Sequence, residues 1–317
     1  MLRSRKLFKQ WRDAKEDLRR RVAMRFVSDR DYLARLYRIQ FGHWPDLNRA
    51  CGFNEKILVK ILTDRRPYLT LFSDKLRVRG YVRRTAPELL LPTLYWCSDQ
   101  AETLPFDTLP NEFVLKANHG SGWNLVVGDK SVLRRADLVH LARRWLRSDF
   151  TIVGREWAYR DIRRAVYAEQ LLRDEGQDAP ADYKLFVFGG RVRVIQVDRD
   201  RFTRHAQILY DAQWKQIEGT IAAAEGKPVA RPATLGSMLK AAEALSAGVD
   251  FVRVDLYEID GKAYFGELTN SPNKGLSPFQ PPSLDRVLGD YLQLDDYSKA
   301  IALEYDPDAG DGEVGSG

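Results

Sequence analysis

The sequence Phe251-Val-Arg-Val-Asp255-Leu-Tyr-Glu-Ile-Asp-Gly261-Lys-Ala-Tyr-Phe-Gly-Glu267-Leu-Thr-Asn270 has the pattern of two β-strands joined by a turn. Side chains alternate between the two faces of a strand, so the first strand has an apolar face and a polar face. The apolar face comprises Val252, Val254 and Leu256, and the polar face comprises Arg253, Asp255 and Tyr257. Each strand carries one acid, Asp255 or Glu267, and the relation between these two acids decides what the hairpin can do.

The length of the turn determines whether the two acids share a face. A two-residue loop would place Glu267 on the face opposite Asp255. A three-residue loop closed by Gly261 in the left-handed conformation pairs Glu258 with Lys262. It makes the acids diagonal neighbours, roughly 7–8 Å apart at the backbone. We expect the three-residue loop, because it gathers the polar residues on one side. The face left for the core is then Val252, Val254, Leu256, Tyr264 and Leu268.

Two carboxylates held on one strand face suit a magnesium ion. Mg²⁺ takes oxygen ligands and usually binds one or two protein carboxylates together with substrate phosphates. Asp255, Glu267 and the amide oxygen of Asn270 form such a set, and Arg253 beside them can hold a phosphate or a developing negative charge. The alternative is an Arg253–Glu267 ion pair on a solvated strand face, with Asp255 exposed.

The composition indicates a globular chain of 317 residues without a disulfide framework. Cys51 and Cys97 are its two cysteines and have no metal-binding spacing, which fits a reducing compartment. No apolar run approaches the roughly 20 residues that span a bilayer, and the N-terminus lacks the apolar core of a signal peptide. We therefore expect a cytoplasmic protein.

Basic residues concentrate at the N-terminus. Residues 1–50 hold 14 Lys and Arg against 6 Asp and Glu. Four apolar residues recur there at helical spacing: Leu7, Trp11, Leu18 and Val22. We expect this amphipathic helix to pack on the body of the protein. The alternative is peripheral contact of residues 1–25 with the inner face of a membrane. No recognition motif accompanies the charge, so we expect no nucleic-acid partner.

Helices and strands are expected along the rest of the chain. Helices are predicted over residues 54–63, 73–84 with Ser73 as N-cap, 132–149 and 233–247. Strands are predicted over residues 112–116, 123–127, 166–172, 183–188 and 192–197. The Asp- and Gly-rich tail from about Asp306 is predicted to be disordered.

A Gly-containing loop joins the first two of these strands. The first strand ends in Lys116, and Ala117-Asn-His-Gly-Ser-Gly122 follows it. Glycines let backbone N–H groups approach an anion closely, and a Lys supplies a point charge. The segment therefore indicates phosphate binding, and a simple hairpin turn is the alternative. Neither GxxxxGK[ST] nor GxGxxG occurs, so the sequence indicates neither a P-loop nor a dinucleotide-binding fold.

The order of these segments resembles the ATP-grasp superfamily, and within it the TupA-like branch named for teichuronopeptide biosynthesis. The resemblance covers roughly residues 40–295. The matching segments are Phe53-Asn-Glu-Lys-Ile57, Ser73-Asp-Lys-Leu-Arg-Val-Arg79, Phe113-Val-Leu-Lys116, Asp182-Tyr-Lys-Leu-Phe186, Arg253-Val-Asp-Leu-Tyr257 and Gly266-Glu-Leu-Thr269.

The resemblance implies an α+β ATP-grasp fold in which two α+β lobes clamp ATP, preceded by an N-terminal helical segment. The expected divisions are a basic N-terminal helical segment (1–50), a helical region before the ATP-grasp lobes (51–111), a small lobe (112–172), a large lobe with the metal-binding hairpin (173–300) and a disordered tail (301–317).

The resemblance also implies roles for individual residues. Arg79, Lys116 and Arg253 match cations that act on the transferring phosphoryl group and are the candidate catalytic residues. The candidate ATP-binding residues are Arg79 and Lys116, His119, Gly120, Ser121 and Gly122 of the loop, Glu169, Gln170, Leu171 and Leu172 of an adenine-binding hinge, Asp182 for the ribose, and Lys184. Asp255 and Glu267 match the ligands of Mg²⁺, expected as two ions. Thr269 stands where many relatives have Asn, and Asn270 follows it, so the third ligand stays open.

The activity implied is that of an ATP- and Mg²⁺-dependent carboxylate–amine ligase that forms an amide through an acyl phosphate. Its partners would be ATP, an acidic saccharide or other carboxylate, and an amine such as an amino acid, in cell-surface polysaccharide biosynthesis. Two alternatives stay open. One is an ATP-grasp sugar or glycan kinase, and the other is a glycosyltransferase-like polysaccharide-assembly protein without ligase activity.

Overall fold

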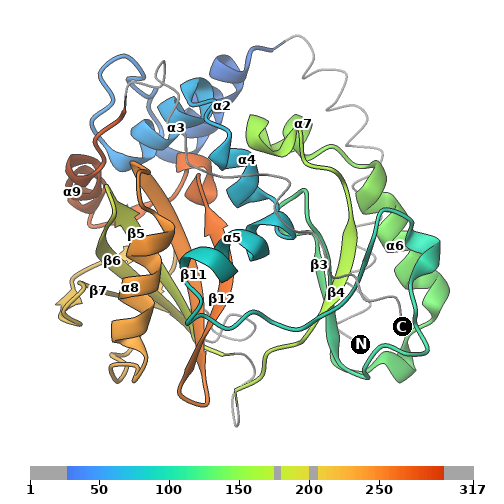
Figure 1. Cartoon of the computed structure of the whole chain (residues 1–317). Coiled ribbons are helices and arrows are strands. Elements are labelled where there is room, and N and C mark those ends of the chain that lie inside the picture. Colours follow the sequence, from blue (N-terminus) through green and yellow to red (C-terminus); the bar gives the residue numbers. More distant parts are fainter. Residues whose placement is uncertain (1–26, 175–179, 200–205, 296–317) are drawn as a thin grey trace.

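Two β-sheets form the framework of the molecule (Figure 1). The computed structural model describes residues 27–174, 180–199 and 206–295. The smaller sheet has the strand order β1-β4-β2-β3, and the larger has the order β10-β7-β6-β5-β11-β12 with β8 paired to β7. With helices packed on both sheets, the predicted α+β class is confirmed.

The strand bounds agree with most of the predicted strands. The smaller sheet contains β1 (Leu94–Ser98), β2 (Phe113–Ala117), β3 (Asn124–Val127) and β4 (Val166–Glu169). The larger contains β5 (Asp182–Phe188), β6 (Arg191–Arg199), β7 (Ala206–Tyr210), β8 (Gln216–Ile217), β10 (Ala224–Glu225), β11 (Phe251–Ile259) and β12 (Lys262–Thr269). A separate pair is β9 (Thr220–Ile221) with β13 (Phe279–Gln280). Strand β4 ends three residues before its predicted end, and β1 joins the smaller sheet from within the region predicted as helical, residues 51–111.

The described α-helices are α2 (Asp29–Phe41), α3 (Phe53–Thr63), α4 (Tyr68–Ser73), α5 (Arg77–Thr85), α6 (Arg135–Arg147), α7 (Phe150–Gly154), α8 (Leu235–Leu245) and α9 (Ser283–Tyr291). Short 3-10 turns are η1 (Ala101–Thr103), η2 (Lys130–Val132), η3 (Trp157–Tyr159) and η4 (Pro272–Gly275). The predicted helix within residues 1–25 and the predicted disordered tail lie outside the described residues. The other domain boundaries stay predictions.

One predicted helix is divided in two. Ser73, expected as an N-cap, is the last residue of α4, and α5 begins at Arg77. The carboxylate of Asp74 accepts the backbone N–H groups of Leu76 and Arg77 at 3.0 and 3.2 Å. This is how an N-cap side chain satisfies the free donors of a helix start. The N-cap position of α5 is Leu76, later than predicted, and Asp74 supplies the capping carboxylate from the preceding turn, in which Lys75 also lies.

Strand alternation gives the larger sheet two different faces. On one face, Phe186, Phe188 and Phe251 pack around Phe53 of α3, with ring centroids 5.0–6.2 Å apart. The same cluster includes residues of α2 and α9. Arg253 and Asp255 continue the Phe251 face beyond these aromatic residues. The opposite face packs on α8, α4 and α5. The polar end of the first face is thus where the hairpin acids lie.

The prediction of a three-residue hairpin turn is wrong. Ile259 pairs with Lys262, so the loop has two residues, and Asp260 and Gly261 both adopt positive φ values of 50° and 67°. These values suit the tight turn that matches the twist of a hairpin. The predicted apolar face is corrected as well, because Ala263 and Phe265 enter the core instead of Tyr264.

A β-bulge brings the two acids back to one face. Leu256 pairs with Phe265 but Asp255 pairs with Glu267, so Gly266 is an extra residue between the two pairs. An extra residue shifts the alternation of the bulged strand by one position. Asp255 and Glu267 are therefore directly opposed, whereas the sequence predicted diagonal neighbours.

Replacing Gly266 with Ala is expected to destabilise the protein by about 1–3 kcal/mol. A Cβ atom at this position would approach the carbonyl oxygen of Asp255 to 2.9 Å and the ring of Tyr257 to 3.0 Å. Denaturant unfolding measures the loss. Gly236→Ala in α8 is the control, because a Cβ atom there has no neighbour within 4 Å. A Gly266→Ala protein as stable as the wild type would contradict the tight bulge.

Candidate active site

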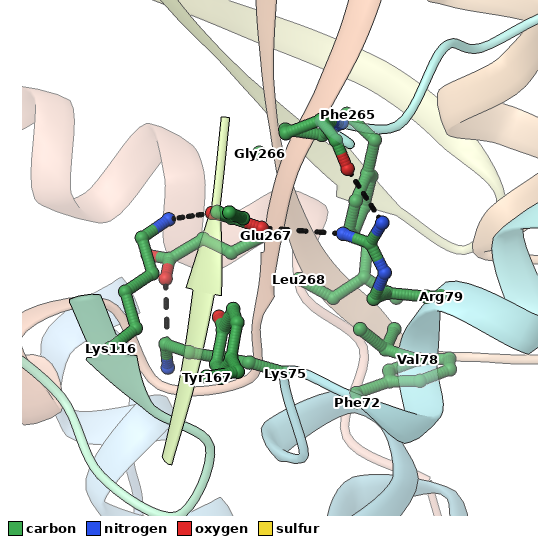
Figure 2. Close-up of a pocket in the computed structure, with 12 residues that line it drawn as sticks. Phe72, Lys75, Val78, Arg79, Lys116, Tyr167, Phe265, Gly266, Glu267 and Leu268 are labelled. Atoms are coloured by element: carbon green, nitrogen blue, oxygen red, sulfur yellow. Dashed lines mark hydrogen bonds and ion pairs between the residues drawn. The ribbon is translucent and has the colours of Figure 1, made fainter. Parts of the chain in front are cut away.

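A pocket lies where three parts of the chain meet: the α4–α5 helices, the smaller sheet and strand β12 (Figure 2). The residues that line it are Phe72, Lys75, Val78, Arg79, Pro92, Lys116, Tyr167, Glu169, Phe265, Gly266, Glu267 and Leu268. Four predicted site residues are among them: Arg79, Lys116, Glu169 and Glu267. The pocket therefore joins residues that are up to nearly 200 positions apart in the sequence.

Arg253 connects the two acids of the hairpin. Its Nε and Nη2 atoms donate to the two carboxylate oxygens of Asp255, each at 2.6 Å. Its Nη2 atom also lies 3.6 Å from Oε1 of Glu267 and donates to the hydroxyl of Thr269 at 3.2 Å. Asp255 is buried, whereas 42% of the Glu267 side chain is exposed. The hairpin thus presents one buried and one accessible carboxylate around a shared guanidinium.

The two acids differ in their electrostatic surroundings. Burial raises the pKa of Asp255 to about 6, although Arg253 and Lys184 act in the opposite direction. Burial would also raise the pKa of Glu267, but Lys75, Arg253 and the more distant Lys116 and Lys184 together lower it below its usual value. The positive charges of these four side chains therefore favour the ionised form of Glu267.

Lys75 is a pocket cation that the sequence analysis did not select. Its Nζ atom donates to the carbonyl oxygen of Gly120 at 3.0 Å. The same atom lies 3.9 Å from Oε2 of Glu267 (Figure 2). It therefore links the Gly-containing loop to the hairpin. The signal for it was the Asp74-Lys75 pair, because the capping role of Asp74 fixes Lys75 just before α5.

Arg79, which the sequence predicted to bind phosphate, is a buried side chain. Its Nη1 atom lies 3.3 Å from Oε2 of Glu169, and its Nη2 atom donates to the carbonyl oxygen of Pro92 at 2.6 Å. The other carboxylate oxygen of Glu169 forms an ion pair with Lys116, whose side chain is 27% exposed. Arg79 thus anchors Glu169, and Lys116 is the more accessible of the two cations. The roles predicted for Arg79, Lys116 and Glu169 toward ATP stay predictions.

Lys184 and Asp182 belong to the neighbouring strand of the same sheet face. Lys184 lies opposite Asp255 in the β5–β11 register. Its ammonium group forms ion pairs with Asp182 and, at 2.7 Å, with Asp198. A row of charged side chains therefore crosses the larger sheet from Glu267 through Asp255 to Lys184. Binding of ribose by Asp182 and of phosphate by Lys184 stays a prediction.

His119 anchors the Gly-containing loop. It is buried, its Nδ1 atom lies 3.1 Å from Oδ1 of Asn118, and its Nε2 atom lies 3.0 Å from the carbonyl oxygen of Trp145. A Cβ atom on Gly120 would lie 2.5 Å from the ring of Trp123, and Gly122 has a φ of 73°. Both glycines are thus required by the loop conformation. Contact of His119, Gly120, Ser121 and Gly122 with ATP stays a prediction.

Acid is expected to destabilise the protein partly through His119. Burial lowers the pKa of His119 below 6.5, so the unfolded chain takes up this proton first. The stability that the neutral ring contributes is complete above about pH 6.5 and is lost as the pH falls through the unfolded-state pKa toward the folded-state value. Unfolding free energies at pH 7.5 and 5.5 should therefore differ less in His119→Gln than in the wild type. Equal differences would contradict a neutral buried His119.

The remaining predicted residues lie at strand ends. Asn270 follows β12, and its Nδ2 atom donates to the carbonyl oxygen of Leu69 and the hydroxyl of Ser73 at 3.0 and 3.1 Å. Its Oδ1 atom is buried and has no hydrogen-bond partner. Gln170 follows β4, where its backbone N–H donates to Thr93 at 2.8 Å. Leu171 and Leu172 come next and are half-buried.

The residues present fit a magnesium ion held mainly by substrate oxygens. No group of three or more His, Cys, Asp or Glu side chains in the described parts of the chain is placed to hold a metal. Asp255 and Glu267 are opposed on one face, and the Oδ1 atom of Asn270 is an acceptor without a donor. Mg²⁺ needs only one or two protein carboxylates when phosphates complete its shell. This donor set suits Mg²⁺ bound together with a polyphosphate.

Asp255 and Glu267 are thus opposed on one sheet face, and Lys75, Arg79 and Lys116 line the adjoining pocket. Comparison with protein families matches residues 55–293 to the TupA-like ATP-grasp family. The chain belongs to this family, as its sequence motifs predicted. A comparison with curated proteins gives no match.

Solved structures with a similar fold include three ligases. D-alanine–D-alanine ligase from Bacillus anthracis in complex with ATP is 17% identical over 63% of this chain and 55% of that chain, with a TM-score of 0.39. L-amino acid ligase from Bacillus licheniformis is 16% identical over 86% and 63%, with a TM-score of 0.45. The ATP-grasp ligase PsnB, with a precursor variant, Mg and ADP, is 13% identical over 71% and 59%, with a TM-score of 0.42. The chain thus spans 55–63% of the length of these three proteins.

None of the helices in the described part of the chain combines the length and the apolar character needed to span a bilayer. The cytoplasmic location stays a prediction, and packing of residues 1–25 on the protein and their contact with a membrane both stay open.

Proposed function

We propose that this protein is an ATP- and Mg²⁺-dependent carboxylate–amine ligase that forms an amide through an acyl phosphate. The observation that carries the proposal is the opposition of Asp255 and Glu267 across the bulge, with Arg253 bound to one acid and close to the other. Membership of the TupA-like ATP-grasp family supports ATP as the nucleotide.

Residues of the hairpin and of the adjoining pocket have separate roles in this proposal. Asp255 and Glu267, with the amide oxygen of Asn270, would hold Mg²⁺, which we expect as two ions. When bound, ATP supplies the phosphoryl group and Mg²⁺ neutralises its negative charge. Lys75 and Lys116 would hold phosphate oxygens, and Arg253 would stabilise the charge that develops during transfer.

We place the reaction in cell-surface polysaccharide biosynthesis. The carboxylate would belong to an acidic saccharide such as a uronic acid, and the amine to an amino acid. Support for this setting is the name of the TupA-like branch, which refers to teichuronopeptide, together with the sequence resemblance. The cationic pocket is compatible with anionic substrates as well as with phosphate.

ADP release in the presence of Mg²⁺, with uronic acids and amino acids supplied singly and in pairs, tests the proposal. The ligase is expected to release ADP at a high rate only when a carboxylate and an amine are both present. ADP release with a sugar alone would instead identify a sugar kinase. Nucleotide binding without ADP release in any combination would indicate an assembly protein without ligase activity.

A further inference from the structure

A second group of charges lies beside the pocket and has no role in the proposed phosphoryl transfer. Glu156 precedes η3, and its Oε1 atom accepts the hydroxyl of Ser271 at 2.7 Å. Ser271 comes directly after Asn270. Lys274 follows in η4. Burial raises the pKa of Glu156 above its ordinary value, and the charges of Lys274 and Lys75 act in the opposite direction. An acid from the η3 segment and a base from the loop after β12 therefore meet next to the hairpin.

Glu156 and Lys274 influence each other electrostatically but have no direct ion-pair contact. In the described parts of the chain, neither the Glu156 carboxylate nor the Lys274 ammonium group forms an ion pair, and both side chains are half-buried. Partial burial of a charge without a partner is unfavourable. A ligand with one positive and one negative group would satisfy both side chains together.

An aromatic wall lies beside Lys274. The Lys274 Nζ atom lies 5.9 Å from the ring centroid of Phe150, and Phe150 contacts Tyr159 and Trp123 with centroid distances of 4.7 and 5.6 Å. Tyr159 is within electrostatic range of both Glu156 and Glu267. The wall therefore extends from the second group of charges to the hairpin acid. Aromatic rings at such a place can cover the apolar part of a ligand or contact its cationic group.

The loop that carries Lys274 is held in an unusual conformation. Asn273, Lys274 and Gly275 have φ values of 44°, 57° and 67° in succession. A Cβ atom on Gly275 would lie 2.4 Å from the carbonyl oxygen of Asn54, and the Asn54 side chain bonds both the N–H and the C=O of Ser277. Helix α3 thus holds the loop firmly, and the position of Lys274 is set by the fold.

We propose that Glu156, Lys274 and the wall of Phe150 and Tyr159 form the binding site for the amine substrate, and that this substrate is a zwitterionic α-amino acid. Glu156 recognises its ammonium group, and Lys274 recognises its carboxylate. The site lies beside Glu267, where an amine must arrive to attack a carboxyl group activated in the pocket. The inference rests on the proposed ligase function and assigns its second substrate.

Binding measured by titration calorimetry tests the assignment. The protein is first saturated with Mg²⁺ and the non-hydrolysable ATP analogue AMPPNP. It is then titrated with each of the common L-α-amino acids, and with the methyl ester and the N-acetyl derivative of the tightest binder. Each derivative lacks one of the two charges, so both are expected to bind about tenfold more weakly or worse.

Glu156→Gln and Lys274→Met are expected to weaken binding of the same amino acid by about tenfold or more, with AMPPNP affinity within about twofold of the wild type. The controls are Glu88→Gln and Lys262→Met, which make the same changes at exposed positions. Unchanged amino-acid affinity in both site variants would overturn the assignment, and so would equal binding of the charged and blocked compounds. If AMPPNP binds and no amino acid does, the assignment of the amine site is wrong, but the proposed ligase function is not contradicted. If AMPPNP does not bind, the proposed function fails with it.

Discussion

Replacing Asp255 with Asn is expected to lower the rate of ADP release by roughly 10³-fold. The substitution keeps the size of the side chain but removes one of two carboxylates that face each other across β11 and β12. It also leaves the half-buried Arg253 without the acid that binds two of its nitrogen atoms. The measurement is the steady-state rate with Mg²⁺, ATP and the substrate pair found in the screen.

Asp260→Asn is the matched control for this variant. It makes the same chemical change on the same hairpin, at an exposed turn position with a φ of 50°, which Asn tolerates well. This control should keep the wild-type rate. If Asp255→Asn also kept the wild-type rate, Asp255 would be a structural partner of Arg253 and the metal site would have to lie elsewhere.

Replacing Lys75 with Met is expected to lower kcat/KM for ATP by roughly 10²-fold. Lys75 is the cation that contacts both the Gly-containing loop and Glu267, so its loss removes a charge from the pocket and a link between this loop and the hairpin. Lys262→Met, at the exposed turn of the hairpin, serves as the control.

Arg79→Met tests which of two roles Arg79 has. The structure indicates that Arg79 anchors Glu169, whereas the sequence predicted that it binds phosphate. Because Arg79 is buried against Glu169 and Pro92, its replacement should mainly lower the free energy of unfolding. A larger loss of ATP affinity in Arg79→Met than in Lys75→Met, in proteins of equal stability, would restore Arg79 as the phosphate-binding residue.

The sequence predicted the hairpin and its acids but gave the wrong geometry. Alternation of apolar and polar residues identified β11 and β12, and the two acids stand on one face as expected. The turn was wrong because a three-residue loop and a two-residue loop followed by a bulge produce the same alternation near the acids. Gly266 was the signal for the bulge, since an isolated glycine within a strand often marks one.

The pocket cations were harder to predict because their roles depend on distant partners. Lys116 lies one residue before the end of β2 and lines the pocket, because a strand fixes where its side chains point. Its predicted role toward ATP stays a prediction. Arg79 and Lys75 are only four residues apart, and no local pattern tells which of them reaches Gly120 and which is buried by Glu169. Likewise, Glu156 and Lys274 meet only in the folded chain.

The most direct test of the central claim is titration calorimetry of ATP with and without Mg²⁺. We claim that Asp255 and Glu267 hold the metal of a bound Mg·ATP. Wild type and Asp260→Asn should therefore bind ATP more tightly with Mg²⁺ than without it, and Asp255→Asn/Glu267→Gln should show no such gain. If the double variant showed the same gain from Mg²⁺ as the wild type, the opposed acids would not be the metal site.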